Sequence, residues 1–183
     1  MGDPRRIGLL GAECTGKSTL ALALADALDG EAVPEQLRQF VAEHGRPPRA
    51  DEQVALLEAQ MRAEDAAAAH TDRPVVIGDP APLMTAVYHQ AYFDDDSLID
   101  SGVAHARGYD LLVCCDTDLP WVDDPGMRDG QDWRDRVHAL LLGPVAARLS
   151  AAGITPLLVH GDVTSRVGQI TEAWRAGAGA RPT

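Results

Sequence analysis

The sequence predicts an α/β fold of three layers, with helices on both faces of a five-stranded parallel sheet. The first observation is that short apolar runs alternate along the chain with longer stretches of helical character. The second is the segment Gly11-Ala12-Glu13-Cys14-Thr15-Gly16-Lys17-Ser18, a full match to the phosphate-binding loop pattern G-x-x-x-x-G-K-[ST]. The third is that this segment lies between an apolar run at residues 7–10 and a leucine- and alanine-rich stretch at 17–28, the strand and helix that the pattern requires. We therefore expect a P-loop NTPase fold.

The remaining strands and helices follow in the same alternation. Strands are expected at residues 31–33, 74–78, 111–115 and 154–159. Helices are expected at residues 35–43, 51–70, 82–92, 97–107, 132–142 and 144–152, and in a final stretch after Gly161-Asp162. The side chains expected to face inward are Leu37, Phe40 and Val41 in the second helix and Val54, Leu57 and Met61 in the third. Gly143-Pro144 is expected to separate two helices, because glycine favours a helix end and proline a helix start.

The chain is expected to form a single domain. Its 183 residues suffice for one substantial core, and no internal repeat is evident. The domain is expected to cover residues 1–175 and to carry a lid over about 118–136, followed by a flexible tail over 176–183.

The predicted lid contains a tryptophan and an arginine in a polar stretch too long for a tight turn. A lid arginine that closes over transferring phosphates raises the rate by about 10³ to 10⁵ in phosphoryl-transfer enzymes. Arg128 is the candidate for this role, with Arg134 or Arg136 behind it. A solvated helix face is the better interpretation for at least one of those two. Trp121 either stacks on a ring of the substrate or seals the lid against the domain.

Composition excludes several classes of function. A net charge of −12 and a pI near 4.7 leave no basic patch or tail for nucleic acid or an anionic membrane. No apolar run approaches the ~20 residues of a membrane span, and residues 1–6 lead into the first strand without a signal-peptide pattern. The three cysteines include the adjacent pair Cys114 and Cys115, which does not suit a disulfide framework. Cys14 is interpreted as a passive loop residue, with an oxidisable thiol as the alternative. These observations predict a cytoplasmic protein.

The phosphate-binding loop indicates a nucleotide. Lys17 is the only lysine among 16 basic residues, and its compact ammonium suits the β and γ phosphates better than the rigid fork of arginine. Glycines permit a tight loop whose N–H groups and following helix N-terminus attract phosphate. The expected cofactors are ATP or GTP, and Mg²⁺ held by Ser18. Nucleotide contacts are expected from Gly11, Glu13, Cys14, Thr15, Gly16, Lys17, Ser18 and Thr19.

Residues that directly follow the other strands are candidates for chemistry, because ligands of such folds bind beyond the carboxyl ends of the strands. Asp79 follows the third strand, where it either completes Mg²⁺ coordination or accepts the proton of the acceptor. Glu35 follows the second strand, where it orients or deprotonates a substrate hydroxyl while Arg38 holds a charge. An i,i+3 surface ion pair between Glu35 and Arg38 is an equal alternative.

Together these segments resemble the ribosylnicotinamide kinase domain of NadR-type NAD-salvage proteins, and the small AAA-labelled ATPases grouped with it. The resemblance rests on residues 11–19, Glu35-x-x-Arg38, Asp79, Asp116-Thr117-Asp118, Trp121-Val122-Asp123-Asp124 and Arg128. It implies transfer of the ATP γ-phosphoryl to the 5′-hydroxyl of nicotinamide riboside, giving nicotinamide mononucleotide and ADP. It also implies that the lid tryptophan lies near the nicotinamide ring. The roles predicted for the site as a whole are catalysis by Lys17, Asp79, Glu35 and Arg128, substrate binding by Glu35, Arg38, Asp79, Trp121 and Asp124, and Mg²⁺ ligation by Ser18 and Asp79.

Two departures keep other functions open. The segment Gly78-Asp79-Pro80-Ala81-Pro82 differs from the Asp-Thr-Asp form of the family, and the H-x-G-H adenylyltransferase motif is absent. A stand-alone kinase is therefore expected, and another nucleoside or metabolite kinase stays open. The competing class is a nucleotide-dependent regulator. The expected partner is a small nucleoside, and the sequence leaves room for a homo-oligomer.

Overall fold

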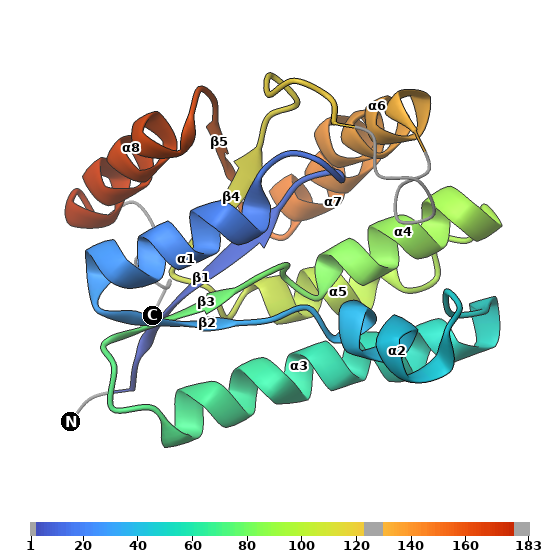
Figure 1. The fold of residues 1–183 in the computed structure, drawn as a ribbon, viewed down its shortest axis with the longest axis horizontal. Coiled ribbons are helices and arrows are strands. Elements are labelled where there is room, and N and C mark those ends of the chain that lie inside the picture. Colours follow the sequence, from blue (N-terminus) through green and yellow to red (C-terminus); the bar gives the residue numbers. More distant parts are fainter. Residues whose placement is uncertain (1–2, 123–129, 178–183) are drawn as a thin grey trace.

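The fold is built on a five-stranded parallel sheet with the strand order β2-β3-β1-β4-β5 (Figure 1). The structure is a computed structural model that describes residues 3–122 and 130–177. Strand β1 is central, because it pairs with β3 on one side and with β4 on the other. The strands are β1 (Arg5–Leu10), β2 (Gly30–Val33), β3 (Val75–Gly78), β4 (Leu111–Cys115) and β5 (Leu157–Val159).

Helices cover both faces of the sheet, which confirms the predicted three-layer α/β fold (Figure 1). One face carries α1 (Lys17–Leu28) and α8 (Val163–Arg175). The other carries α3 (Gln53–His70), α4 (Leu83–Phe93), α5 (Ile99–Ala106), α6 (Gln131–Leu140) and α7 (Ala146–Ala151). Helix α2 (Gln36–His44) follows β2 and packs on α3, which is preceded by a 3₁₀ turn (Ala50–Glu52).

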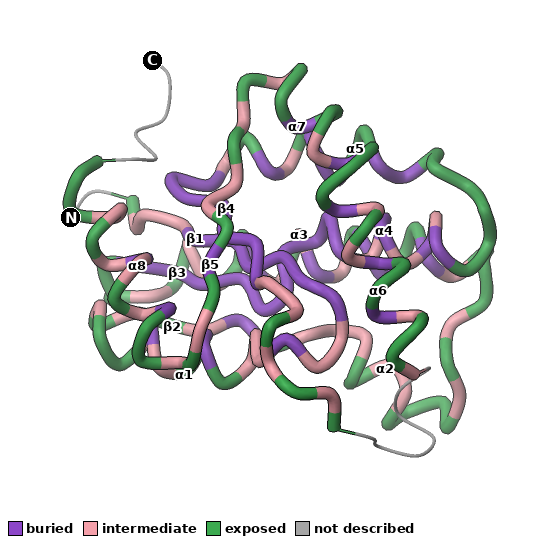
Figure 2. The backbone as a smooth tube through the Cα atoms, turned by 90° about the horizontal axis from the view of Figure 1, so that it is seen from above, coloured by how far each residue is buried: buried purple, intermediate pink, exposed green. Residues whose placement is uncertain are grey.

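Alternation along the central strands produces two cores. Ile7 and Leu9 of β1 are fully buried on the side of α1 and α8, whereas Leu10 is buried on the opposite side. Strand β4 repeats this arrangement with Val113 and Leu112. Burying an aliphatic side chain contributes about 1.5–3 kcal/mol, so the same strands hold both helical layers. Figure 2 shows the buried positions along the strands and the exposed positions on the outer turns of the helices.

Helix α3 turns a partly polar face to the interior. Leu57 is buried and Met61 partly buried as predicted, but Val54 is 47% exposed, so its prediction was wrong. The buried positions include Gln60 and Glu64, which are 3% and 1% exposed. Apolar periodicity misjudged this face because buried polar side chains occupy core positions where they find hydrogen-bond partners.

Helix α2 lies at the margin of the fold and contributes no buried residue. Leu37, Phe40 and Val41, predicted to face inward, are only half-buried. The ring of Phe40 is covered locally, because it stacks on His44 with ring centroids 4.0 Å apart. The short helix therefore adds little to the core.

The helix after the predicted lid does not end at Gly143-Pro144, so the prediction of two separate helices was wrong. Residues 131–151 form one continuous helix, in which α6 passes through a π-helical segment (Leu141–Val145) into α7. Proline lacks an N–H and its ring clashes with the preceding α-helical turn, whereas the wider i→i+5 turn accommodates it. Leu141 and Val145 are 3% and 1% exposed, so core packing outweighs the local preference of the glycine and proline.

Candidate active site

The strand ends that the sequence singled out meet at one edge of the sheet, because all five strands are parallel. The P-loop (residues 11–18) follows β1, and hydrogen bonds between backbones fix the neighbouring exits. The N–H of Asp79, after β3, donates to the carbonyl of Val33 at 3.0 Å. The N–H of Asp116, after β4, donates to the carbonyl of Val159 at 3.0 Å. The edge is therefore a row of fixed backbone positions with the P-loop at its centre.

Two glycines shape the P-loop as the sequence requires. Gly11 has φ +151°, and a Cβ there would lie 2.8 Å from the Thr15 hydroxyl and 3.0 Å from Cys115 Cβ. Gly16 has φ +76°, the left-handed conformation, directly before α1 begins at Lys17. Larger residues would strain both positions. The loop thus turns tightly into the N-terminus of α1, where unpaired N–H groups attract anions.

Lys17 is held across the loop by main-chain carbonyls. Its Nζ donates to the carbonyls of Gly11 and Ala12, each at 2.7 Å. The fully buried hydroxyl of Thr15 donates to the same Ala12 carbonyl at 2.7 Å. An ammonium has three donors, so these two bonds leave one for a phosphate oxygen.

A buried arginine lies against the P-loop from α8. Arg166 is 1% exposed, and Nη1 of its guanidinium donates to the carbonyl of Thr15 at 2.5 Å. Nη2 donates to the Asp116 carbonyl at 3.1 Å and to Asp118 Oδ1 at 2.5 Å. The sequence analysis missed Arg166, because an arginine in an amphipathic helix carries no signal that separates a buried from a solvated one. The α8 arginine joins the P-loop to the exit of β4.

Asp118 extends this connection to the exit of β5. Its Oδ2 accepts from the N–H of Gly161 at 2.5 Å while Oδ1 accepts from Arg166. Burial acts to raise the pKa of Asp118, but the bonds from Gly161 and Arg166 outweigh it and hold that pKa below its usual value. The carboxylate is therefore ionised at neutral pH and pairs with the guanidinium.

Asp79 is the most buried of the predicted site carboxylates that the structure describes. It is 8% exposed, and its Oδ1 has no hydrogen-bond partner among the described residues. Leaving a buried polar atom unpaired costs about 1–3 kcal/mol. Such an atom is available to a ligand, and a carboxylate oxygen suits a cation or a hydroxyl donor.

Glu35 lies in the turn between β2 and α2, and this turn is fixed from α3. The Oε2 of Glu35 accepts from Arg38 Nε at 3.0 Å, so the i,i+3 ion pair is present. The Glu35 side chain is 23% exposed and that of Arg38 69% exposed. The buried Gln60 bonds to the backbone on both sides of Glu35, at Pro34 and at Gln36. The backbone around Glu35 is therefore fixed, while its carboxylate stays partly exposed.

Tyr88 of α4 lies near both Glu13 of the P-loop and Glu35, and the sequence analysis missed it. Burial raises the pKa of Tyr88 well above its usual value, and the carboxylates of Glu13 and Glu35 raise it further. The backbone N–H of Glu13 hydrogen-bonds the Tyr88 oxygen. A neutral hydroxyl thus lies close to the loop and to a predicted catalytic carboxylate.

The segment that leads into the predicted lid packs on the P-loop. The N–H of Val122 donates to Cys14 Sγ at 3.3 Å, and this thiol lies 3.7 Å from the carbonyl oxygen of Pro120. Arg134 is 5% exposed and donates from Nη1 to the carbonyl of Leu119 at 3.0 Å. The start of the lid is therefore attached both to the P-loop and to α6.

The other predicted lid residues differ in placement. Trp121 is half-buried, with the Arg134 guanidinium 5.5 Å from the centre of its ring. Arg136 is exposed, as predicted for at least one of the two arginines. Arg128 and Asp124 lie outside the described residues. The described part of the lid thus offers an aromatic surface and a buried cation.

The remaining P-loop positions lie on the first turn of α1 or just before it. Ser18 and Glu13 are half-buried, whereas Thr19 is exposed. Ser18 is therefore better placed than Thr19 for contact with a ligand of the loop.

Burial raises the pKa of Cys114 to about 12, so this thiol stays protonated and unreactive.

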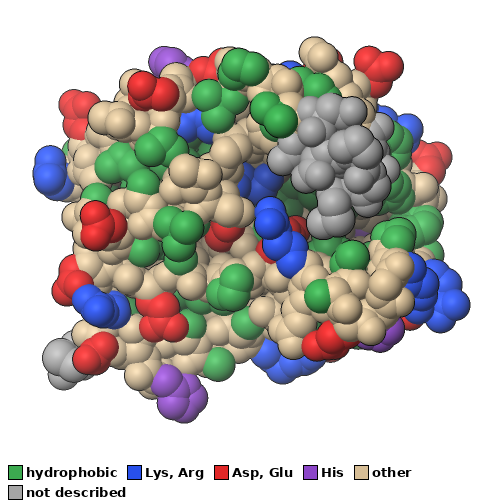
Figure 3. All heavy atoms as spheres, in the orientation of Figure 1, with side chains coloured by type: hydrophobic (Ala, Val, Ile, Leu, Met, Phe, Trp, Pro, Cys, Tyr) green, Lys and Arg blue, Asp and Glu red, His purple; other side chains and the backbone are tan. Residues whose placement is uncertain are grey.

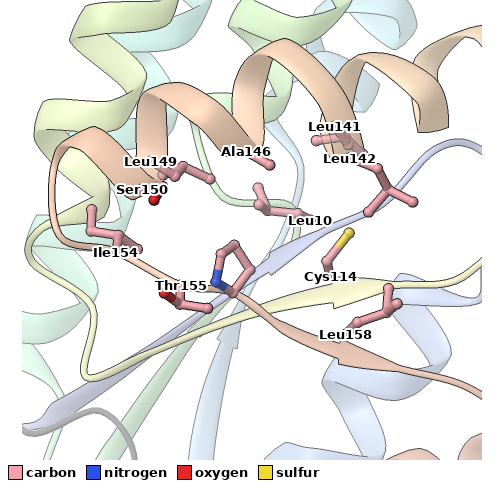
Figure 4. A pocket seen from close by; sticks show the side chains of 11 residues that line it. Leu10, Cys114, Leu141, Leu142, Ala146, Leu149, Ser150, Ile154, Thr155 and Leu158 are labelled. Atoms are coloured by element: carbon pink, nitrogen blue, oxygen red, sulfur yellow. The ribbon is translucent and has the colours of Figure 1, made fainter.

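An apolar cavity beside β5 and the charged surface are both unsuited to phosphate. A cavity of about 270 Å³ lies between β4, β5 and α7, lined by Leu10, Cys114, Leu149 and other uncharged residues (Figure 4). Basic and acidic side chains are interspersed on the face seen in Figure 3, without a broad basic patch. Within residues 3–122 and 130–177, no helix has both the length and the apolar character of a membrane span.

Comparisons with known proteins agree with this fold. A sequence family described as AAA domain matches residues 6–166. The comparison with curated proteins gave no match. A NadR protein in complex with NR is 18% identical, with a TM-score of 0.67 over 92% of this chain and 51% of that chain. A NadR protein in complex with NAD and AMP-PNP is 16% identical, with a TM-score of 0.70 over 92% of this chain and 49% of that one.

A smaller solved kinase matches over most of both chains. Thymidylate kinase from Candida albicans is 13% identical, with a TM-score of 0.68 over 97% of this chain and 93% of that chain. This chain spans about half the length of the NadR proteins, and identities this low show a shared fold. The resemblance to the NadR-type domain is thus confirmed at the level of fold. Because the family match covers most of the chain, the protein belongs to the AAA domain family.

Proposed function

We propose that the chain is an ATP-dependent kinase that phosphorylates the 5′-hydroxyl of nicotinamide riboside, giving nicotinamide mononucleotide and ADP. The observation that carries the kinase assignment is the unpaired, buried oxygen of Asp79 at the same sheet edge as the P-loop. The fold shared with a NadR protein solved in complex with NR supports a nucleoside acceptor. Another nucleoside or metabolite kinase is the alternative within this class, and a cytoplasmic location is part of the proposal.

The P-loop is proposed to hold the phosphates of ATP, with GTP as the alternative. Lys17 would exchange one of its carbonyl bonds, or add its third donor, to reach the transferring phosphate. The N–H groups of residues 13–18 would surround the remaining oxygens. Because the ammonium is already held over the loop, little side-chain ordering is needed when the nucleotide binds.

Asp79 and Ser18 are proposed to hold Mg²⁺. A magnesium ion in such enzymes uses one or two protein oxygens, with the rest of its shell from phosphate and water. This fits a chain whose described residues contain no group of three or more metal-binding side chains, and a carboxylate oxygen without a partner. When bound, Mg²⁺ neutralises charge on the β and γ phosphates.

Glu35 is proposed to receive the acceptor proton. The acceptor hydroxyl oxygen forms a bond to the γ phosphorus, the bond from that phosphorus to the bridging oxygen of ADP breaks, and the hydroxyl proton passes to the Glu35 carboxylate. Glu35 suits this role better than Asp79, because its carboxylate is partly exposed and its backbone is held by Gln60. Positioning of this kind supplies much of the catalysis in phosphoryl transfer.

The acceptor is proposed to bind between α2, α4 and the lid. Arg38 bonds to Glu35, and the Tyr88 hydroxyl lies close enough to Glu35 to feel its charge. Trp121 offers a flat surface for the nicotinamide ring. Arg128 and Asp124, outside the described residues, stay proposed contacts with the transferring phosphate and the substrate.

A nucleotide-dependent regulator is the second candidate. The contact between Val122 and Cys14 favours it, because a change in the P-loop would reach the lid directly. The two candidates differ in the response to an acceptor. A regulator releases ADP slowly whatever nucleoside is present.

The test measures ADP release from Mg-ATP with nicotinamide riboside, with a panel of other nucleosides, and without acceptor. Nicotinamide mononucleotide is identified by mass spectrometry. Lys17→Ala should abolish release. Asp79→Asn should lower kcat by about 100-fold or more, as expected for loss of a charge that acts at the transferring group. Asp72→Asn, an exposed aspartate before β3, is the matched control and should leave kcat unchanged.

The outcomes separate the candidates. Stimulation by nicotinamide riboside alone, lost in Lys17→Ala, supports the salvage kinase. Stimulation by another nucleoside keeps the kinase and replaces the substrate. ADP release that no acceptor stimulates favours the regulator and rejects the kinase.

A further inference from the structure

We propose that Arg166 is a positioning residue for the nucleotide phosphates, acting through the peptide bond between Thr15 and Gly16. Its Nη1 holds the Thr15 carbonyl at 2.5 Å. In a trans peptide the carbonyl and the following N–H point in opposite directions. The bond from Arg166 therefore directs the N–H of Gly16 away from α8. This role rests on the proposed function, since it requires a phosphate in the P-loop.

The guanidinium is well suited to fix one orientation of this peptide. Arg166 is 1% exposed, so its bonds are not in competition with water. Nη2 is occupied by the Asp116 carbonyl and the Asp118 carboxylate, while Nε has no hydrogen-bond partner among the described residues. A planar fork with partners on both terminal nitrogens cannot rotate without breaking bonds. The Thr15 carbonyl thus has a rigid donor.

The peptide before Gly16 benefits from such a donor. With φ +76° Gly16 has the backbone freedom of glycine, so the peptide before it can turn over more readily than one flanked by other residues. A turned-over peptide would present the Thr15 carbonyl, an acceptor, to an anionic phosphate. Arg166 excludes that arrangement because its Nη1 would lose its partner in a buried site.

Asp118 orients the arginine in turn. One carboxylate oxygen accepts from Arg166 and the other from the N–H of Gly161, at 2.5 Å each. The ion pair therefore links the turns after β4 and β5 to the P-loop. Asp118 acts on the phosphates only through Arg166, so its removal should have the smaller effect.

The test measures the Kd of Mg-ADP by calorimetry for the full chain and its variants, with Mg-pyrophosphate as a second probe that has phosphates and no nucleoside. Arg166→Met should raise the Kd of both probes by about 10- to 100-fold, as expected for loss of one bond to a charged group. Arg166→Lys keeps a charged donor and should recover most of that loss. Asp118→Asn should raise both Kd values several-fold.

A destabilised control separates positioning from stability. Leu149 is 1% exposed in α7, on the other side of the sheet from α8. Leu149→Ala should lower the melting temperature and leave both Kd values unchanged. Equal weakening of binding in Leu149→Ala and Arg166→Met would assign the effect to stability and overturn the role of Arg166.

Other outcomes are also decisive. Wild-type affinity in Arg166→Met overturns the inference and leaves the proposed kinase intact. If Arg166→Met does not fold, Asp118→Asn decides, and a wild-type Kd there overturns the inference. Weakening for Mg-ADP alone would place Arg166 on the nucleoside side and reject the peptide role. If the wild type binds neither probe, both the inference and the proposed function fail. Weakened binding in a chain that transfers no phosphoryl group keeps the inference and rejects the kinase.

Discussion

Gln60 holds the backbone on both sides of Glu35. Its Oε1 accepts from the N–H of Gln36 at 2.9 Å, and its Nε2 donates to the carbonyl of Pro34 at 3.5 Å. The side chain is 3% exposed and comes from α3, whereas Glu35 lies in the turn after β2. A buried amide thus determines where a partly exposed carboxylate lies.

Replacement of Gln60 by leucine should loosen this turn. Gln60→Leu keeps a similar volume but leaves the N–H of Gln36 without its partner, at a cost of about 1–3 kcal/mol in unfolding free energy. If Glu35 receives the acceptor proton, kcat should fall while the KM for ATP stays the same. Urea denaturation and steady-state kinetics measure the two effects. Gln39→Leu, which loses only an exposed bond to Glu43, is the control; wild-type stability and kcat in Gln60→Leu would contradict the prediction.

Lys17 allows a direct test of occupancy of the P-loop. It is the only lysine in the sequence, so an amine-selective reagent has one side-chain target. Mg-ATP should strongly reduce its labelling, because a bound phosphate would cover the ammonium. Peptide mapping by mass spectrometry reads the result, with the α-amino group as internal reference. Labelling that stays the same at saturating Mg-ATP would show that the loop does not take up the nucleotide.

Gly78 should be intolerant of a side chain. A Cβ at this position would overlap the carboxylate of Glu64, which is 1% exposed. Gly78→Ala should therefore lower the unfolding free energy by about 1–3 kcal/mol and, by displacing the adjacent Asp79, also lower kcat.

The matched control is Gly168→Ala in α8. A Cβ there has no neighbour within 4 Å among the described residues, so the change should raise the unfolding free energy by about 0.5–1 kcal/mol. Urea denaturation compares the two variants. Equal stability of both would mean that the space around Gly78 is not limiting.

Glu52 should make stability depend on pH in the acid range. The side-chain hydrogen bond from Arg46, followed by the N–H of Arg49, lowers the pKa of Glu52 from 4.5 to about 2. A depressed folded pKa stabilises the fold above the unfolded value, and this contribution is lost as pH falls through the folded value. Wild type should therefore exceed Glu52→Gln in stability at pH 7, with the difference shrinking between pH 4.5 and about 2.

Chemical denaturation at several pH values measures that difference. Glu58→Gln is the control, since Glu58 is exposed and has a single 3.3 Å bond to Arg62. A difference between wild type and Glu52→Gln that stays constant from pH 7 to pH 2.5 would refute the assignment.

The elements that could be predicted well from the sequence are those with a strong local signal. Helix α1 begins at Lys17 and ends at Leu28, as predicted, because the loop glycine and the run of helix formers fix it within a short window. Strand β4 matches residues 111–115 for the same reason, being a compact apolar run. Strand β5 covers only Leu157–Val159 instead of 154–159, since Ile154 packs on the core outside the sheet.

Contacts across long sequence separations could not be predicted. Arg166 meets Thr15 from 151 positions away, and nothing in its neighbourhood distinguishes it from a solvated arginine. The sequence analysis missed Gln60 and Tyr88 for the same reason, because their partners depend on how α3 and α4 pack. The roles of Glu35, Asp79 and the P-loop residues stay predictions, as do those of Arg128 and Asp124 outside the described residues.

The continuity of residues 131–151 has a mechanical consequence. At 1.5 Å per residue, this helix is a rod of about 30 Å. Its first residues, 131–136, belong to the predicted lid, and its other end lies near the connection to β5. Gly143-Pro144 does not interrupt this helix. A tilt of its N-terminal end would therefore displace its C-terminal end, at the outer edge of the sheet, because no hinge lies between them.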